Sequence, residues 1–131
     1  MSAYRKFRDI QFRDLGLLKA ALADLGYAIV EEGDHLPLYG YQGDLRPERA
    51  ALVVRRQHLT RASNDLGFQR TDQGYVPVIS EYDLGALLDG KFLARLRTAY
   101  NLRVVERVTR RLHGTRVAQT EGNVIRVRVR Y

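Results

Sequence analysis

Apolar residues recur at helical spacing in two segments of the chain. In residues 14–25, leucine and alanine return every three or four positions, Asp14 can cap the first turn, and Gly26 can end the helix in the left-handed conformation. In residues 91–113 the same spacing covers a longer stretch, and Gly114 follows it. The apolar positions of this second segment are Leu93, Leu96, Tyr100, Val104, Val108 and Leu112. The pattern therefore predicts two amphipathic helices.

Short apolar or alternating stretches predict strands before and between these helices. Pro37 favours an edge strand or the start of a strand, and Pro77 favours an edge strand, because proline has no amide hydrogen to donate to a neighbour. Thr71-Asp72-Gln73-Gly74 suits a tight hairpin turn. The predicted strands are residues 4–11, 27–30, 36–42, 51–54, 66–70 and 75–79, with a polar turn at 31–34 and a loop at 43–49.

The last nine residues alternate between apolar and basic side chains with period two, as a half-buried strand does. Arg126, Arg128 and Arg130 would then stand in a row on the solvent side, about 7 Å apart, which is twice the rise per residue of a strand. Residues 115–120 would pair with this strand about Glu121-Gly122. This row of arginines is the most clearly defined basic surface that the sequence predicts.

Together these elements predict one α+β domain spanning residues 1–131. Its mainly antiparallel sheet would be covered by the two helices, in the order β-α-β-β-β-β-β-α-β-β. A chain of 131 residues is long enough to bury a core without metal or disulfide support. The absence of cysteine excludes disulfides and thiolate sites, and no stretch resembles a signal peptide or a membrane span. We therefore expect a cytoplasmic protein with no membrane partner.

Positive charge is concentrated at the C-terminal end. The formal net charge is +7, but residues 91–131 contain eleven Lys and Arg against Glu106 and Glu121, whereas residues 1–90 carry a net charge of −2. Such asymmetry is typical of proteins that bind nucleic acid, anionic lipid or an acidic protein surface. The alternative is a solvated basic face that maintains solubility.

No motif for catalysis, metal binding or nucleotide binding is present. His35, His58 and His113 lack the short spacings of metal ligands, and neither a glycine-rich dinucleotide motif nor a phosphate loop occurs. Serine, histidine and carboxylate residues show no recognisable catalytic arrangement. We therefore expect no catalytic, metal or cofactor site and a non-enzymatic protein, with an enzyme of unrecognised pocket as an alternative.

Two surfaces are candidates for binding. Tyr39, Tyr41 and Gln42 lie in a glycine-flanked turn that can offer flat contact area to a protein partner, together with Arg126, Arg128 and Arg130. A nucleic acid is the alternative partner of the basic surface. Five neutralised phosphates would then give a log–log salt slope of about −4.5 on duplex DNA. The residues proposed to contact nucleic acid are Lys91, Arg95, Arg103, Arg107, Arg110, Arg126, Arg128 and Arg130.

The chain also resembles a family of small uncharacterised proteins, encoded as conserved hypothetical reading frames in cyanobacteria and algal plastids and more widely in bacteria. Two features depart from the family pattern: Ala3 replaces a histidine, and residues 79–82 replace a tryptophan-rich segment. The motifs that carry the resemblance are Ser2-Ala3-Tyr4, residues 18–27, Gly40-Tyr41-Gln42-Gly43, Val53-Val54-Arg55-Arg56, Asp65-Leu66-Gly67-Phe68, Tyr75, Phe92, Leu96, Tyr100-Asn101 and the terminal strand.

This resemblance implies an α+β fold without established catalytic residues. It also implies a place in a multi-protein assembly, since members of the family are often encoded near AAA-type ATPases. The expected function is therefore that of an interaction or adaptor module. The oligomeric state and the identity of the partner stay open at this point.

Overall fold

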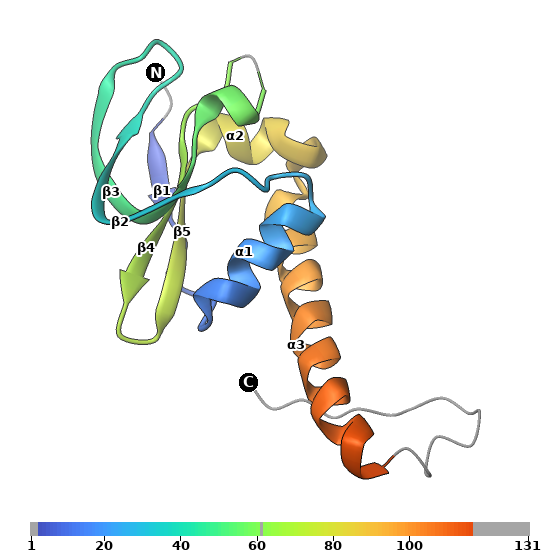
Figure 1. Ribbon diagram of the computed structural model, residues 1–131. Helices are drawn as coiled ribbons and strands as arrows, with labels where there is room; N and C mark the ends of the chain where they lie inside the picture. Colours follow the sequence, from blue (N-terminus) through green and yellow to red (C-terminus); the bar gives the residue numbers. More distant parts are fainter. Residues whose placement is uncertain (1–2, 61, 117–131) are drawn as a thin grey trace.

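The computed structural model describes residues 3–60 and 62–116. These residues form a five-stranded antiparallel sheet in the order β1-β5-β4-β3-β2 (Figure 1). Tight turns join β2 to β3 and β4 to β5, and β1 lies at one edge beside β5. The strands are β1 (Tyr4–Lys6), β2 (Glu31–Tyr39), β3 (Leu45–Val54), β4 (Leu66–Thr71) and β5 (Gly74–Ser80). The predicted α+β class and antiparallel sheet are confirmed.

Three α-helices accompany the sheet in the described part of the chain. Helix α1 (Leu15–Asp24) begins where the Asp14 carboxylate accepts a hydrogen bond from the amide of Leu17 at 2.9 Å, and Gly26 follows its end with a φ of +99°. Both signals were predicted from the sequence. The remaining helices are α2 (Glu81–Ala86), α3 (Phe92–Arg116) and the short 3-10 turns η1 (Arg56–His58) and η2 (Leu87–Gly90).

The main core lies between one face of the sheet and the helices α1 and α3 (Figure 1). Leu18 and Leu22 of α1 are fully buried there, as is Leu96 of α3. Each such side chain contributes roughly 1.5–3 kcal/mol by leaving water. The sheet contributes Leu52, Val54, Leu66, Phe68 and Ile79 to this core.

A smaller apolar cluster covers the opposite face of the sheet. Val53 and Val78 of this cluster alternate with Leu52, Val54 and Ile79 of the main core, since successive side chains of a strand point to opposite faces. Tyr4 and Leu36 pack against it. The cluster consists of Leu38, Ala50, Val53 and Val78.

Several boundaries differ from the sequence prediction. Residues 31–34 were predicted to turn but begin β2, residues 27–30 are irregular, most of the predicted loop at 43–49 belongs to β3, and the first strand ends at Lys6. Two ion pairs anchor the polar start of β2: Glu31 lies 2.9 Å from Arg55, and Glu32 lies 2.8 Å from Lys19 of α1. Contacts with distant residues thus override the local preference of this acidic segment for a turn.

The prediction from Pro37 is confirmed, whereas the prediction from Pro77 is wrong. Pro37 lies on the edge strand β2, but Pro77 lies on β5, between β1 and β4. The carbonyl of Pro77 accepts a hydrogen bond from the amide of Phe7 at 2.9 Å, so its nitrogen also faces the β1 side. The missing amide hydrogen therefore interrupts no bond to Phe68, its partner in β4.

The end of the long helix also differs from the prediction. Helix α3 continues through Gly114 to Arg116, so Gly114 does not terminate it, and Thr115 is helical rather than extended. A glycine weakens a helix by about 1 kcal/mol relative to alanine but does not forbid one. The remainder of the predicted terminal hairpin, with Arg126, Arg128 and Arg130, lies outside the described residues.

Candidate interaction site at the turn between β2 and β3

The turn between β2 and β3 is closed by two main-chain hydrogen bonds. The amide of Gly40 donates to the carbonyl of Asp44, and the amide of Gly43 donates to the carbonyl of Gly40, both at 2.8 Å. Gly43 has a φ of +80°, a backbone conformation that residues other than glycine rarely adopt. Tyr39 and Tyr41 are 37% and 43% exposed. The turn therefore presents the predicted aromatic side chains to solvent.

A buried carboxylate holds the first side of this turn. Asp65, only 1% exposed, precedes β4 and accepts hydrogen bonds at 2.8 Å from the amides of Tyr39 and Arg56. Its own amide donates to the carbonyl of Tyr39 at 2.9 Å. Two segments that are separated by 26 residues are thus joined through one side chain.

Arg55 neutralises this buried carboxylate and extends the connection to β2. Its guanidinium lies 2.7 Å from Asp65, donates to the carbonyl of Pro37 at 2.7 Å and forms a two-bond pair with Glu31 at 2.9 Å. The same group lies over the ring of Tyr39, 5.8 Å from its centroid. The pair with Glu31 is the main cause of the raised pKa of Arg55, and Arg55 in turn lowers the pKa of Glu31.

Asn64 holds the other side of the turn. Its side-chain oxygen accepts from the amide of Tyr41 at 3.1 Å, and its side-chain nitrogen donates to the hydroxyl of Ser80 at 2.9 Å. Its own amide donates to the carboxylate of Asp83 at 3.0 Å. Arg56 adds a bond of 2.9 Å to the carbonyl of Tyr41. Asn64, Ser80 and Asp83 are all buried, so water competes little for these bonds.

Tyr4 of β1 completes the polar cluster beneath the turn. Its hydroxyl donates to the main-chain carbonyl of Asp65 at 2.6 Å. Burial, followed by the nearby charges of Asp65 and Asp83, raises the pKa of Tyr4. Hence β1, the Asn64-Asp65 segment and the start of α2 support the turn at one end of the sheet, uppermost in Figure 1.

The sequence prediction found the turn but missed its support. Arg55 and Arg56 were placed correctly at the end of a buried strand, but Asn64 was not named as a candidate and Asp65 appeared only in a motif of the family resemblance, with no role in the turn. Ser80 and Asp83 have the spacing of a capping box, and Ser80 does cap α2. That spacing was the available signal for a helix start at this position.

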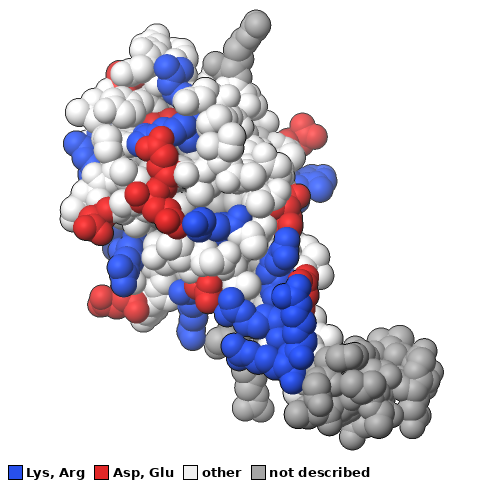
Figure 2. Space-filling model, viewed as in Figure 1, with Lys and Arg blue, Asp and Glu red and all other residues white. Residues whose placement is uncertain are grey.

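The helical part of the predicted basic surface is mostly occupied by internal ion pairs. Figure 2 shows Lys and Arg side chains gathered over the C-terminal half of α3. Arg103 holds Asp24 of α1 with two bonds of 2.8 and 2.6 Å, and lowers the pKa of that carboxyl. Arg107 lies 3.0 Å from Asp14, and Arg110 pairs with Glu106. These three arginines therefore contact carboxylates within the described residues.

The five predicted helix cations are spread along α3, from Lys91 just before its start to Arg110. Lys91 and Arg95 lie near the start of α3, beside the end of α1, where they border a groove with Leu25. Their position is a turn or more away from the pairs made by Arg103 and Arg107. Asp24, the partner of Arg103, lines the same groove, so the two sets of cations adjoin at the end of α1.

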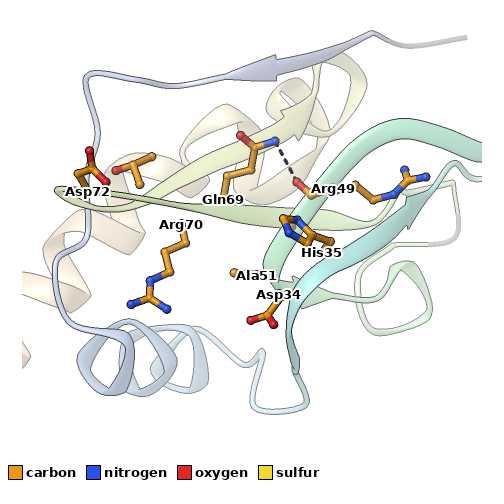
Figure 3. A pocket seen from close by; sticks show the side chains of 9 residues that line it. Asp34, His35, Arg49, Ala51, Gln69, Arg70 and Asp72 are labelled. Carbon is orange, nitrogen blue, oxygen red and sulfur yellow. Dashed lines mark hydrogen bonds between the residues drawn. The ribbon is translucent and has the colours of Figure 1, made fainter.

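A polar hollow of about 600 Å³ lies over the sheet where β2 bulges (Figure 3). Ala51 lies at the centre of this hollow, and its polar lining includes Asp34, His35, Arg70 and Asp72. Among the described residues, no hydrogen bond or ion pair connects Asp34 or His35 to another side chain, and no group of His, Asp and Glu has the arrangement of a metal site. The hollow therefore supplies no recognisable catalytic set.

The comparisons with known proteins give a family but no function. Within the described part of the chain, no helix combines the length and apolar character needed to cross a membrane. Neither the curated proteins nor the solved structures include a significant match to the sequence. A family sequence profile described as "Protein of unknown function (DUF1257)" matches residues 21–127, which is most of the chain. The chain therefore belongs to the DUF1257 family.

Proposed function

We propose that this protein is a non-enzymatic interaction or adaptor module of a cytoplasmic protein assembly. The turn between β2 and β3 would contact a folded protein partner through Tyr39, Tyr41 and Gln42. One observation carries the proposal: exposed aromatic side chains stand on a turn whose main chain is fixed by buried Asn64 and Asp65.

Physical chemistry favours such an arrangement for recognition. A surface that is already ordered loses less conformational entropy when a partner binds. Tyrosine and arginine are also enriched among the residues that dominate protein interfaces. Here Tyr39 and Tyr41 are exposed, and Arg55 and Arg56 hold the turn directly beneath them.

The finer parts of the proposal come from the family resemblance. We propose that the assembly contains an AAA-type ATPase. We also propose that the chain is related to the cyanobacterial and plastid proteins that it resembles. Contacts of this kind, dominated by tyrosine and main-chain groups, should show only modest salt sensitivity.

Nucleic-acid binding is the alternative function, and the basic patch in Figure 2 is the observation in its favour. It is weaker because Arg103, Arg107 and Arg110 already contact carboxylates. An enzyme is a further alternative, and the hollow around Asp34 and His35, whose side chains are both exposed, offers it no catalytic arrangement among the described residues.

Site-specific photo-crosslinking in the native cytoplasm tests the proposal. One variant carries a photoreactive residue in place of Tyr41, and a matched control carries it in place of the exposed Gln73 in the turn between β4 and β5. We expect a protein adduct from position 41 that is absent from position 73. The purified partner should then bind the Tyr41→Ala variant at least about tenfold more weakly than the original protein, or 1.4 kcal/mol.

Two results would overturn the proposal. One is the absence of any protein adduct specific to position 41. The other is an identified partner that binds the original protein and the Tyr41→Ala variant equally well.

A further inference from the structure

Helix α3 has a second face that does not pack on the sheet or on α1. Its buried positions, among them Leu96 and Ala99, face the core. Ala94, Thr98 and Leu102 follow one another at four-residue spacing on a different side of the helix, and all three are exposed. Leu102 is 64% exposed, more than any other large apolar side chain among the described residues.

This face borders a groove of about 590 Å³ between the end of α1 and the first half of α3. Small side chains on the α3 side allow another main chain to approach closely, and Leu102 stands beside them as an apolar wall. Grooves of this kind accept the apolar face of an amphipathic helix. The groove is lined by Asp24, Leu25, Lys91, Ala94, Arg95, Thr98, Ala99 and Leu102.

The charges around the groove specify an acidic occupant. Lys91 and Arg95 are exposed at its border. The acidic residue in its lining, Asp24, is neutralised by the two bonds from Arg103. A helix with Asp or Glu beside its apolar stripe would therefore meet complementary charge.

The same charges disfavour a second copy of α3 as the occupant. Residues 91–112 contain seven Lys and Arg but only one acidic residue, Glu106. Two such helices side by side would bring like charges together. Nucleic acid is disfavoured by the leucine and alanine in the lining, since phosphates gain nothing from apolar contacts.

We propose that the groove between α1 and α3 binds an acidic amphipathic helix of a partner protein. Leu102 would pack against the apolar stripe of that helix, and Lys91 and Arg95 would pair with its carboxylates. This surface is formed by helices, whereas the turn of the proposed function belongs to the strands. The inference therefore stands independently of the turn and would give an adaptor its second contact.

Synthetic peptides test the inference directly. The probes are an 18-residue helix with leucines at heptad spacing flanked by glutamates, the same peptide with lysines in place of the glutamates, and a scrambled acidic peptide. Binding is measured by fluorescence anisotropy with the full chain. Leu102→Asp is compared with Leu45→Asp, because Leu45 is a similarly exposed leucine (58%) that lies outside the groove.

We expect the acidic amphipathic peptide to bind, and Leu102→Asp to weaken it at least tenfold while Leu45→Asp leaves it unchanged. Arg95→Glu should remove the preference for the acidic over the basic peptide, because a carboxylate would then stand beside Lys91. This second variant changes an exposed side chain, so it keeps the test valid should Leu102→Asp fold poorly.

Four outcomes would overturn the inference. The acidic peptide binds no better than its scrambled form, or Leu102→Asp and Leu45→Asp behave alike. Sedimentation shows a dimer that Leu102→Asp dissociates, which would make a second copy the occupant. Duplex DNA binds instead and is displaced from Lys91 and Arg95 by salt. None of these results depends on the crosslinking from position 41.

Discussion

Asp65 and Tyr39, which are 26 residues apart in the sequence, are joined by two hydrogen bonds. The amide of Tyr39 donates to the Asp65 carboxylate at 2.8 Å, and the amide of Asp65 donates to the Tyr39 carbonyl at 2.9 Å. Arg55 contacts the same carboxylate oxygen as Tyr39 at 2.7 Å. The turn with its exposed tyrosines is thus held by a buried carboxylate that forms an ion pair with Arg55. The proposed function depends on this arrangement.

The first prediction concerns that acid. Asp65→Asn replaces one acceptor oxygen with a donor that faces the amides of Tyr39 or Arg56, and it removes the charge opposite Arg55. We expect a loss of about 2–4 kcal/mol in the free energy of unfolding, measured by denaturant titration. Glu31→Gln is the control, because its side chain is about half exposed and its loss should cost less than about 1 kcal/mol. Equal effects of the two variants would contradict this account of the cluster.

The second prediction is a loss of stability in acid. The amide of Leu17 and the guanidinium of Arg107 lower the pKa of Asp14, and Arg103 and Arg55 lower those of Asp24 and Glu31. The unfolded chain, with ordinary values of 3.8 for Asp and 4.5 for Glu, therefore takes up protons first as the pH falls. Stability that is present above these values should be lost between about pH 5 and pH 2.

Thermal unfolding across that pH range measures this loss. Asp24→Asn should reduce the dependence of the melting temperature on pH, since the titrating group is gone. A melting temperature that stays constant down to pH 2, or an unchanged slope in the variant, would refute the role of the ion pair with Arg103.

The third prediction compares two glycines. A Cβ at Gly67 would lie 2.9 Å from the Cβ of Ala50 and 3.1 Å from Leu38 in the smaller cluster, whereas a Cβ at Gly85 of α2 would meet nothing within 4 Å. Gly67→Ala should therefore destabilise the fold by about 1–3 kcal/mol through overpacking. Gly85→Ala should stabilise it by about 0.4–1 kcal/mol. Chemical denaturation measures the free energy of unfolding of both variants. If Gly67→Ala were the more stable of the two, the cluster of Leu38 and Ala50 would be packed differently from this structure.

The fourth prediction separates the adaptor from a nucleic-acid-binding protein. Because Arg103, Arg107 and Arg110 hold carboxylates, we expect no steep, salt-dependent affinity for duplex DNA or structured RNA near physiological salt. Fluorescence anisotropy over a salt series measures it, with a variant in which Arg126, Arg128 and Arg130 are changed to glutamate. A slope near −4.5 that the variant abolishes would make nucleic acid the partner.

Local patterns in the sequence predicted the elements whose cause is local. The helix from Leu15 is capped by Asp14 and followed by Gly26, and the hairpin around Thr71 to Gly74 is set by its turn residues. Both are confirmed, since periodicity and turn chemistry act within a few residues.

Elements that depend on distant partners were not predicted. The acidic start of β2 is extended because Glu31 and Glu32 pair with Arg55 and Lys19, and no local pattern contains that information. The candidate site shows the same division. Tyr39, Tyr41 and Gln42 were named from the turn, whereas Asn64 and Asp65 act across more than 20 residues.

The measurement that tests the central claim most directly is amide hydrogen exchange of the turn in the free protein. Tyr39 and Tyr41 donate their amides to buried side chains, while the amide of Gln42 has no acceptor among the described residues. We expect the amides of Tyr39 and Tyr41 to exchange as slowly as those of the central strands and the amide of Gln42 to exchange rapidly. Exchange of all three amides at the rate of an unstructured peptide would contradict this expectation, because the turn would then not be ordered before a partner binds.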